Sequence, residues 1–96
     1  ELERVAEAGP GAALPHDALR LVEQLLVALE RGEVRAARRE ADGSWHAVPW
    51  VKCGILLGFR AGAVVDMSPP AGRLRFFDKD TYPTQALDAS RGVRIV

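Results

Sequence analysis

The chain has 96 residues, which suits one modest domain, and 48% of them are hydrophobic, which excludes a disordered polypeptide. Its 13 basic and 13 acidic residues cancel, so the charge gives no reason to expect nucleic acid or an anionic membrane as a partner. There is no apolar run of about 18 residues to span a membrane, no signal peptide in residues 1–4, and one cysteine, Cys53, which excludes an internal disulfide. We therefore expect a cytoplasmic protein.

The first third of the chain predicts a short helix followed by a long amphipathic one. Residues 2–8 favour a helix that ends at Gly9-Pro10-Gly11. Asp17 is an expected N-cap or first-turn acid for the next helix, and Gly32 is its expected C-terminal stop. Between them apolar side chains recur at helical spacing, which predicts one buried stripe; they are Ala18, Leu21, Val22, Leu25, Leu26 and Leu29.

A β-hairpin is expected next. Asp42-Gly43 is favoured in two-residue hairpin turns, because both central residues of such a turn need positive φ. Residues 34–41 and 44–48 are then the two arms, and this turn pairs Glu40 with Trp45. Neither face of the hairpin is cleanly apolar, and an isolated hairpin is only marginally stable. We therefore expect one face to rest on the helices or on another subunit.

The stretch after the hairpin predicts a central helix. Pro49 ends strand pairing and suits the first turn of a helix. Residues 50–60 are apolar almost all round, and a helix that is apolar on every side is buried on every side. We expect this helix at the centre of the domain, packed on the amphipathic stripe, with Cys53 as inert packing.

The last third predicts little regular structure. Residues 63–67 favour a short strand and residues 68–72 are irregular. Residues 73–80 alternate at first and then carry two adjacent phenylalanines into a charged turn, which either anchors a functional loop or is solvent-exposed packing. Residues 92–96 alternate like a strand, which either pairs back onto the domain or, as we expect, leads into a longer chain.

Side-chain combinations that carry chemistry are scarce. His16 and His46 have no cysteine or carboxylate at ligand spacing, so we predict no metal site. Ser44 and His46 are expected on opposite faces of their strand and so do not form a nucleophile–base pair. A basic cluster in the first hairpin arm either grips phosphate or, as we expect, is a solvated face; it consists of Arg35, Arg38 and Arg39.

Six motifs together resemble a known family. They are Val34-Arg35-Ala36-Ala37, Asp42-Gly43-Ser44-Trp45, Trp50-Val51-Lys52, Ile55-Leu56-Leu57-Gly58-Phe59-Arg60, Phe76-Phe77-Asp78-Lys79 and Gly92-Val93-Arg94-Ile95-Val96. In order and spacing, residues 21–96 resemble the N-terminal domain of tetrahydrodipicolinate N-succinyltransferase. The chain departs from the family pattern in a first arm that is one residue longer, in Cys53 where a second lysine is expected, and in residues 80–83, which replace a Val-Pro.

The predicted elements and the resemblance imply an α+β fold, a small helical domain with a β-hairpin. Residues 1–96 would form a single N-terminal helix–hairpin domain, with residues 92–96 leading toward a catalytic left-handed parallel β-helix outside this chain. The resemblance implies succinyl transfer from succinyl-CoA to the amino group of ring-opened tetrahydrodipicolinate in lysine and diaminopimelate biosynthesis. It also implies a homotrimer in which the partners of this domain are its own β-helix and the neighbouring subunits, with no nucleic acid and no membrane.

In that family the catalytic and coenzyme-binding residues belong to the β-helix and the segment after it. The resemblance therefore implies no catalytic residue and no bound cofactor in residues 1–96. Six residues match family motifs and are expected at a substrate entrance or a subunit contact; they are Trp50, Lys52, Arg60, Phe77, Asp78 and Lys79. Two other functions stay open, a non-catalytic interaction or oligomerisation module and a nucleic-acid-binding hairpin, which the neutral charge disfavours.

Overall fold

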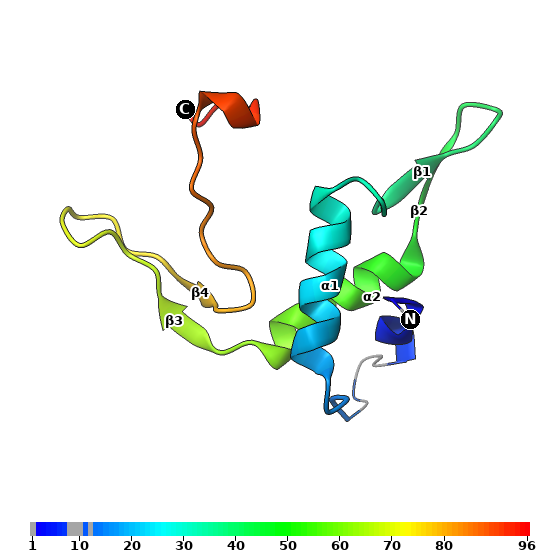
Figure 1. Ribbon diagram of the computed structural model, residues 1–96, viewed down its shortest axis with the longest axis horizontal. Helices are drawn as coiled ribbons and strands as arrows, with labels where there is room; N and C mark the ends of the chain where they lie inside the picture. The colour runs from blue at the N-terminus through cyan, green and yellow to red at the C-terminus, as the bar shows by residue number, and fades with distance from the viewer. Residues whose placement is uncertain (1, 8–10, 12) are drawn as a thin grey trace.

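The computed structural model describes residues 2–7, 11 and 13–96. Figure 1 shows two helices in contact, with two antiparallel hairpins projecting from them on opposite sides. The fold is therefore α+β, as the sequence predicts. In chain order the elements are η1 (Leu2–Glu7), α1 (Ala18–Glu30), β1 (Ala37–Arg39), β2 (Trp45–Ala47), α2 (Pro49–Ala61), β3 (Val64–Asp66), β4 (Phe77–Lys79) and η2 (Ala89–Arg91).

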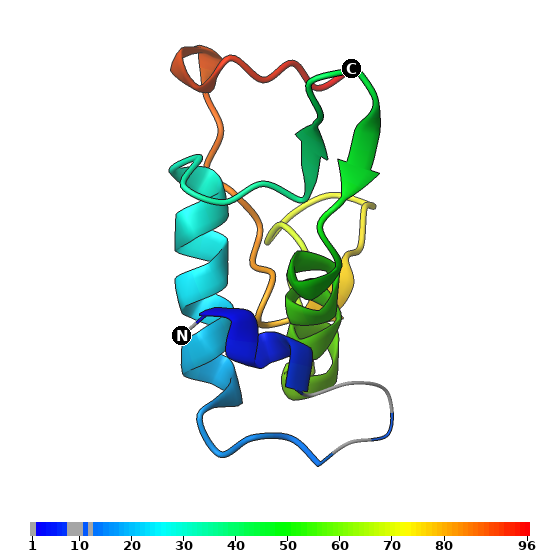
Figure 2. The ribbon, with the colours of Figure 1, turned by 90° about the vertical axis from the view of Figure 1, so that its right-hand side faces the viewer.

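The predicted stripe on α1 is the core of the structure. Its buried residues face α2, and the 3₁₀ helix η1 lies across both helices (Figure 2). The core cluster consists of Val5, Ala18, Leu21, Val22 and Leu57. The expected pairing of the amphipathic helix with α2 is thus confirmed, and η1 confirms the short N-terminal helix. The expected stop at Gly9-Pro10-Gly11 falls partly on residues outside the described ones.

The prediction that α2 is buried on every side is wrong. Val51, Gly54 and Leu57 face α1 and η1 and are buried, whereas Leu56 and Phe59 are 45% and 43% exposed. The reason is that α1 and η1 both pack on the same side of α2. The opposite side of α2 is apolar and the described chain covers it only in part, where the Tyr82 ring lies 4.8 Å from that of Phe59.

The first hairpin forms with a different turn and register from those expected. Arg39 pairs with Trp45, and the Gly43 N–H donates to the Glu40 carbonyl at 3.0 Å while the Glu40 N–H donates to the Ser44 carbonyl at 2.8 Å. This is a three-residue loop closed by a glycine at φ +89°. The two-residue turn is excluded because it needs positive φ at Asp42 too, and no described residue other than glycine has positive φ.

A second hairpin forms where the sequence indicated one strand and a charged turn. The strand expected in residues 63–67 is confirmed as β3, and its partner β4 contains Asp78 and Lys79, which the sequence placed in a turn.

Residues 93–96 form no strand and do not pair back onto the domain. No helix among the described residues is long and apolar enough to cross a membrane.

The chain is more extended than a compact domain of its length. Its radius of gyration is 15.8 Å, against roughly 12.5 Å for a compact domain of 96 residues. Its accessible surface of 7314 Å² exceeds by roughly 1,900 Å² the surface of a compact monomer of 10.4 kDa. The excess lies partly in the hairpins, where most strand residues of both sheets are exposed.

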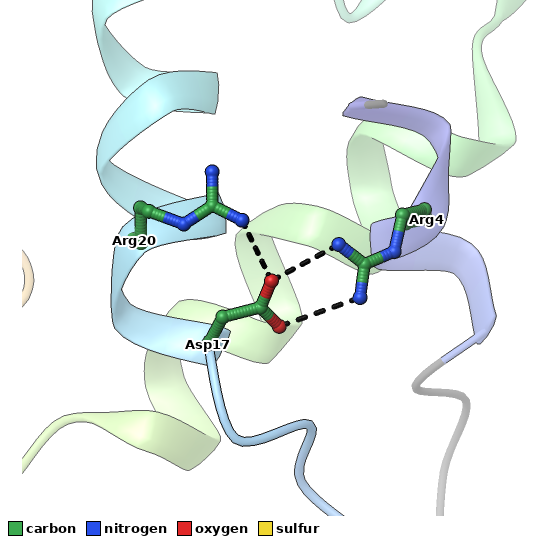
Figure 3. A network of polar contacts seen from close by, with 3 residues as sticks. All are labelled: Arg4, Asp17 and Arg20. Atoms are coloured by element: carbon green, nitrogen blue, oxygen red, sulfur yellow. Dashed lines mark hydrogen bonds and ion pairs between the residues drawn. The ribbon is translucent and has the colours of Figure 1, made fainter.

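An ion network joins the start of α1 to η1 (Figure 3). Arg4 donates to both carboxylate oxygens of Asp17, at 3.0 and 3.4 Å, and Arg20 donates at 2.7 Å. Asp17 occupies the predicted N-cap position, but its side chain caps no backbone N–H. The hydrogen bonds from Arg4, its principal partner, lower the pKa of Asp17 from 3.8 to about 2.

We predict that Leu21→Ala lowers the free energy of unfolding by about 2–5 kcal/mol, because Leu21 is fully buried between α1, α2 and η1. Leu19→Ala is the matched control, since Leu19 lies on the same helix and is 59% exposed. It should change the free energy by no more than about 0.5 kcal/mol. Urea denaturation compares the two, and equal losses would contradict this assignment of the core.

The Asp17 network predicts a pH-dependent stability. Because the folded-state pKa lies below the unfolded one, its contribution is complete above the ordinary pKa of 3.8 and is lost as pH falls toward about 2. Asp17→Asn should therefore unfold more easily than the parent near neutral pH, and the difference should disappear at the acid end of this window. Thermal unfolding across the window measures this, and Arg4→Met should behave similarly. A difference independent of pH would contradict the role of the network.

Candidate functional site

The family-matched residues on α2 lie at opposite ends of the helix. Trp50 is half-buried and packs against the core cluster, while Lys52 is exposed one turn from the N-terminus of α2. Arg60 is exposed in the last turn of the same helix. At a rise of ~1.5 Å per residue, Trp50 and Arg60 are about 15 Å apart along the helix axis. These residues do not converge on one site.

The family-matched residues on β4 point to both faces of the second hairpin. Phe77 is paired with Asp66 and is 62% exposed, and Asp78 is exposed on the opposite face because successive strand residues alternate. Lys79 is half-buried, and its Nζ donates to the Gly62 carbonyl at 3.2 Å. Asp78 and Lys79 therefore do not act together on one ligand from the same face.

The structure does bring Lys79 and two following residues together at the C-terminal half of α2. The Thr81 hydroxyl donates to the Gly58 carbonyl at 2.7 Å, and the Tyr82 hydroxyl donates to the Ile55 carbonyl at 2.5 Å. We call these three residues, Lys79, Thr81 and Tyr82, the side-chain cap of α2. The Gly58 carbonyl also accepts from the Gly62 N–H at 3.0 Å, so the Thr81 hydroxyl adds a second hydrogen bond there. Lys79 lies at the C-terminus of the helix, where the helix dipole favours a cation. The cap therefore fixes residues 79–82 against α2.

Glycines in α2 and just after it make this cap possible. A Cβ on Gly58 would lie 2.2 Å from the Tyr82 hydroxyl oxygen, and a Cβ on Gly62 would lie 2.5 Å from Thr81 Oγ1. The Tyr82 ring also lies 4.8 Å from that of Phe59, and burial raises the pKa of the Tyr82 hydroxyl. Sequence reasoning missed this contact, although glycines four residues apart, at positions 54, 58 and 62, lie on one side of a helix.

The tip of the first hairpin holds a row of hydrogen-bonded polar side chains, two of which the sequence predicted on opposite faces of the strand. Ser44 Oγ and His46 Nε2 are 3.2 Å apart, so the expectation of opposite faces is wrong: strand residues two positions apart share a face. The Ser44 hydroxyl donates to Asp42 at 2.6 Å, and this bond lowers the pKa of Asp42. His46 must then donate to Ser44 rather than accept its proton. The arrangement stabilises the turn and does not activate a nucleophile.

The basic residues of the first hairpin do not gather on one face. Arg38 pairs with His46 across the strands and forms an ion pair with Glu40 at 2.8 Å. Arg39 lies on the opposite face, with its guanidinium carbon 6.0 Å from the centroid of the Trp45 ring.

Elsewhere, no three His, Cys, Asp or Glu side chains of the described residues are grouped to hold a metal ion, and Cys53 is a free, half-buried thiol.

Comparison with known proteins identifies the family of the helical part. The family model for the N-terminal domain of tetrahydrodipicolinate N-succinyltransferase matches residues 3–61. The chain belongs to this family. It is also 43% identical, over 58 residues, to the 2,3,4,5-tetrahydropyridine-2,6-dicarboxylate N-succinyltransferases of Brucella ovis, Brucella canis and Brucella melitensis biotype 2. The matched region is 60% of this chain and only 20% of each relative.

The family match covers the elements that build the core. It starts at residue 3 and so includes η1, upstream of the region that resembled the family by motifs. It ends at Ala61, the last residue of α2. In this chain the matched residues form η1 from residue 3 onward, α1, the first hairpin and α2. The second hairpin and the side-chain cap of α2 lie beyond the match.

We predict that Gly58→Ala lowers the free energy of unfolding by about 1–3 kcal/mol, because the new methyl group displaces the Tyr82 ring. Elsewhere in a helix the same change would stabilise by about 0.5–1 kcal/mol. In a Tyr82→Ala background the clash is gone, so Gly58→Ala should become stabilising. Urea denaturation of the four proteins of this cycle measures the coupling. Equal effects of Gly58→Ala in both backgrounds would contradict the contact.

Proposed function

We propose that this chain is the N-terminal domain of a CoA-dependent N-succinyltransferase that acts on 2,3,4,5-tetrahydropyridine-2,6-dicarboxylate, a step of lysine and diaminopimelate biosynthesis. The observation that carries this proposal is the family match over residues 3–61, together with the activity named for the Brucella relatives. The complete enzyme uses succinyl-CoA as co-substrate and works in the cytoplasm as a homotrimer.

The chemistry of the reaction supports the placement of acyl transfer in a domain other than residues 1–96. Water first adds across the C=N bond of the cyclic imine and the ring opens, which frees the amine. The amine nitrogen then attacks the thioester carbonyl, a C–N bond forms, the C–S bond breaks, and the amine loses a proton while CoA leaves as the thiol. This needs a base and oxyanion donors within hydrogen-bond reach in one cleft. In the described residues, the group of Asp42, Ser44 and His46 lies on an exposed tip with the serine proton already donated to Asp42.

We therefore assign acyl transfer to a β-helix domain that follows residues 92–96. The domain formed by residues 1–96 binds no cofactor, caps that β-helix and helps to shape the substrate entrance. Lys52 and Asp78 are exposed and suit contact with substrate or a neighbouring subunit, as do Arg60 and Phe77. Trp50 and Lys79 hold the domain itself together, through the core and the side-chain cap of α2.

A second candidate function is a non-catalytic interaction or oligomerisation module. The surface excess of roughly 1,900 Å² favours it, because that area is comparable with a complete protein–protein interface. The two functions differ in one property: a module acting alone leaves acyl-CoA unchanged.

The test is the activity of the natural gene product that contains this chain. We expect release of the CoA thiol from succinyl-CoA that requires the cyclic dicarboxylate. Its intact mass should be about three times the 10.4 kDa of this chain, because the 58 matched residues are only 20% of each relative. A product of about 10.4 kDa, or one that releases no thiol, would contradict the enzyme proposal and favour the interaction module.

We predict that Lys52→Ala raises the KM for the dicarboxylate about two- to fivefold with little change in kcat, because an exposed cation at an entrance contributes modest binding energy. Lys52→Arg keeps the charge and should restore the parent KM. Steady-state kinetics at low ionic strength measure both variants. An unchanged KM in Lys52→Ala would remove Lys52 from the substrate entrance and leave a subunit contact as its role.

A further inference from the structure

An open groove of about 410 Å³ lies on the outer side of α1, where residues 80–83 pass the helix. Its apolar floor includes Leu19 and Val27, which are 59% and 39% exposed, and the half-buried Leu26. Leu19 and Val27 lie outside the stripe that α1 buries against α2, and Leu26 lies at its edge, partly packed against the core cluster. The groove is therefore apolar surface that the described part of the chain leaves uncovered.

Carboxylates surround this floor. Glu23, Glu30 and Asp80 line the groove, and its lining in the described residues includes no Lys, Arg or His. Glu23 and Glu30 form no ion pair with any residue that the structure describes, and one Asp80 oxygen accepts from the Ala63 N–H at 2.9 Å. Covering the floor without cations would bury these charges unpaired, which is costly. The occupant must therefore combine apolar and basic side chains.

A segment of the chain itself has this composition. Residues 73–77 read Arg-Leu-Arg-Phe-Phe and lead from the tip of the second hairpin into β4. Leu74 and Phe76 are 68% and 49% exposed, and both arginines are exposed. The Met67 N–H donates to the Phe76 carbonyl at 2.8 Å, which continues the pairing beyond β4. In an extended segment Arg73 and Arg75 lie on one side, and Leu74 and Phe76 on the other.

We propose that the groove on α1 binds residues 73–77 of a second copy of this chain. Leu74 and Phe76 cover the apolar floor. The long side chains of Arg73 and Arg75 leave the other side of the segment and bend back around it to reach the exposed Glu23 and Glu30. The two carboxylates are about 10 Å apart along α1, and the two arginines are about 7 Å apart along a strand, a difference that long arginine side chains span.

The occupant comes from another copy because the second hairpin projects away from α1 within one chain (Figure 1). Two different surfaces then meet, so the contact is head-to-tail and can close into a ring. The surface excess of roughly 1,900 Å² is sufficient for such an interface. The inference rests on the subunit contacts of the proposed function and assigns one of them to defined residues.

Disulfide trapping in the complete natural protein tests this contact. Two differently tagged chains, both carrying Cys53→Ser, are co-expressed, one with Val27→Cys and the other with Leu74→Cys. Mild oxidation should link the two tags, because in the proposed contact Leu74 covers the floor that includes Val27. The matched control replaces Leu74→Cys with Ala41→Cys, an exposed position at the tip of the other hairpin. A yield no higher than that of the control would overturn the proposal.

Charge reversal tests the ionic part of the contact. Arg75→Glu in the Leu74→Cys chain should lower the yield of linked chains at least roughly tenfold, because it places like charges together. Adding Glu30→Arg to the Val27→Cys chain should restore the yield. A yield insensitive to these charges would contradict the second copy as occupant. So would mainly intrachain linkage, detected by mass spectrometry, in a single chain that carries both Val27→Cys and Leu74→Cys. CoA-thiol release by the same preparations is scored separately, so trapped chains without activity would contradict only the proposed function.

Discussion

At Gly54, α2 approaches α1 and η1 more closely than any larger residue would permit. A Cβ there would lie 2.3 Å from Leu25 Cδ2 and 2.9 Å from Val5 Cγ2, and both of those side chains are fully buried. This contact forms a small core from three short helices without a sheet to support it. Both hairpins are attached to the ends of α2, so their positions depend on this packing.

The core covers one side of each helix only. Leu56 and Phe59 on α2 remain 45% and 43% exposed, the acidic groove on α1 is open, and both hairpins expose nearly all of their strand residues. A hairpin of three-residue strands has little stability of its own, and the side-chain cap of α2 holds the base of the second one in place. Such a design leaves contact surface on both helices and on both hairpins.

Local sequence patterns predicted the structure correctly where residues close together in the chain decide it. The helical spacing from Ala18 to Leu29 predicted α1 and its buried side, because a stripe of that width has a single way to be buried. Asp42-Gly43 located the hairpin but not its register, since one more loop residue in the same turn shifts every pair. The candidate site residues were selected because they match family motifs, which say nothing about their distance from one another. Two of them, Trp50 and Arg60, lie at opposite ends of α2 because the helix is 13 residues long.

The sequence by itself determined the two long helices, the presence of the first hairpin, the α1 stripe and the family, because these depend on residue spacing and order along the chain. The tertiary structure alone decided which side of α2 is buried, because an all-apolar helix carries no information about its partners. It alone also decided that residues 79–82 cap α2 and that β4 pairs with β3. These contacts join residues far apart in the chain through single hydrogen bonds and close glycine packing, which leave no periodic pattern in the sequence.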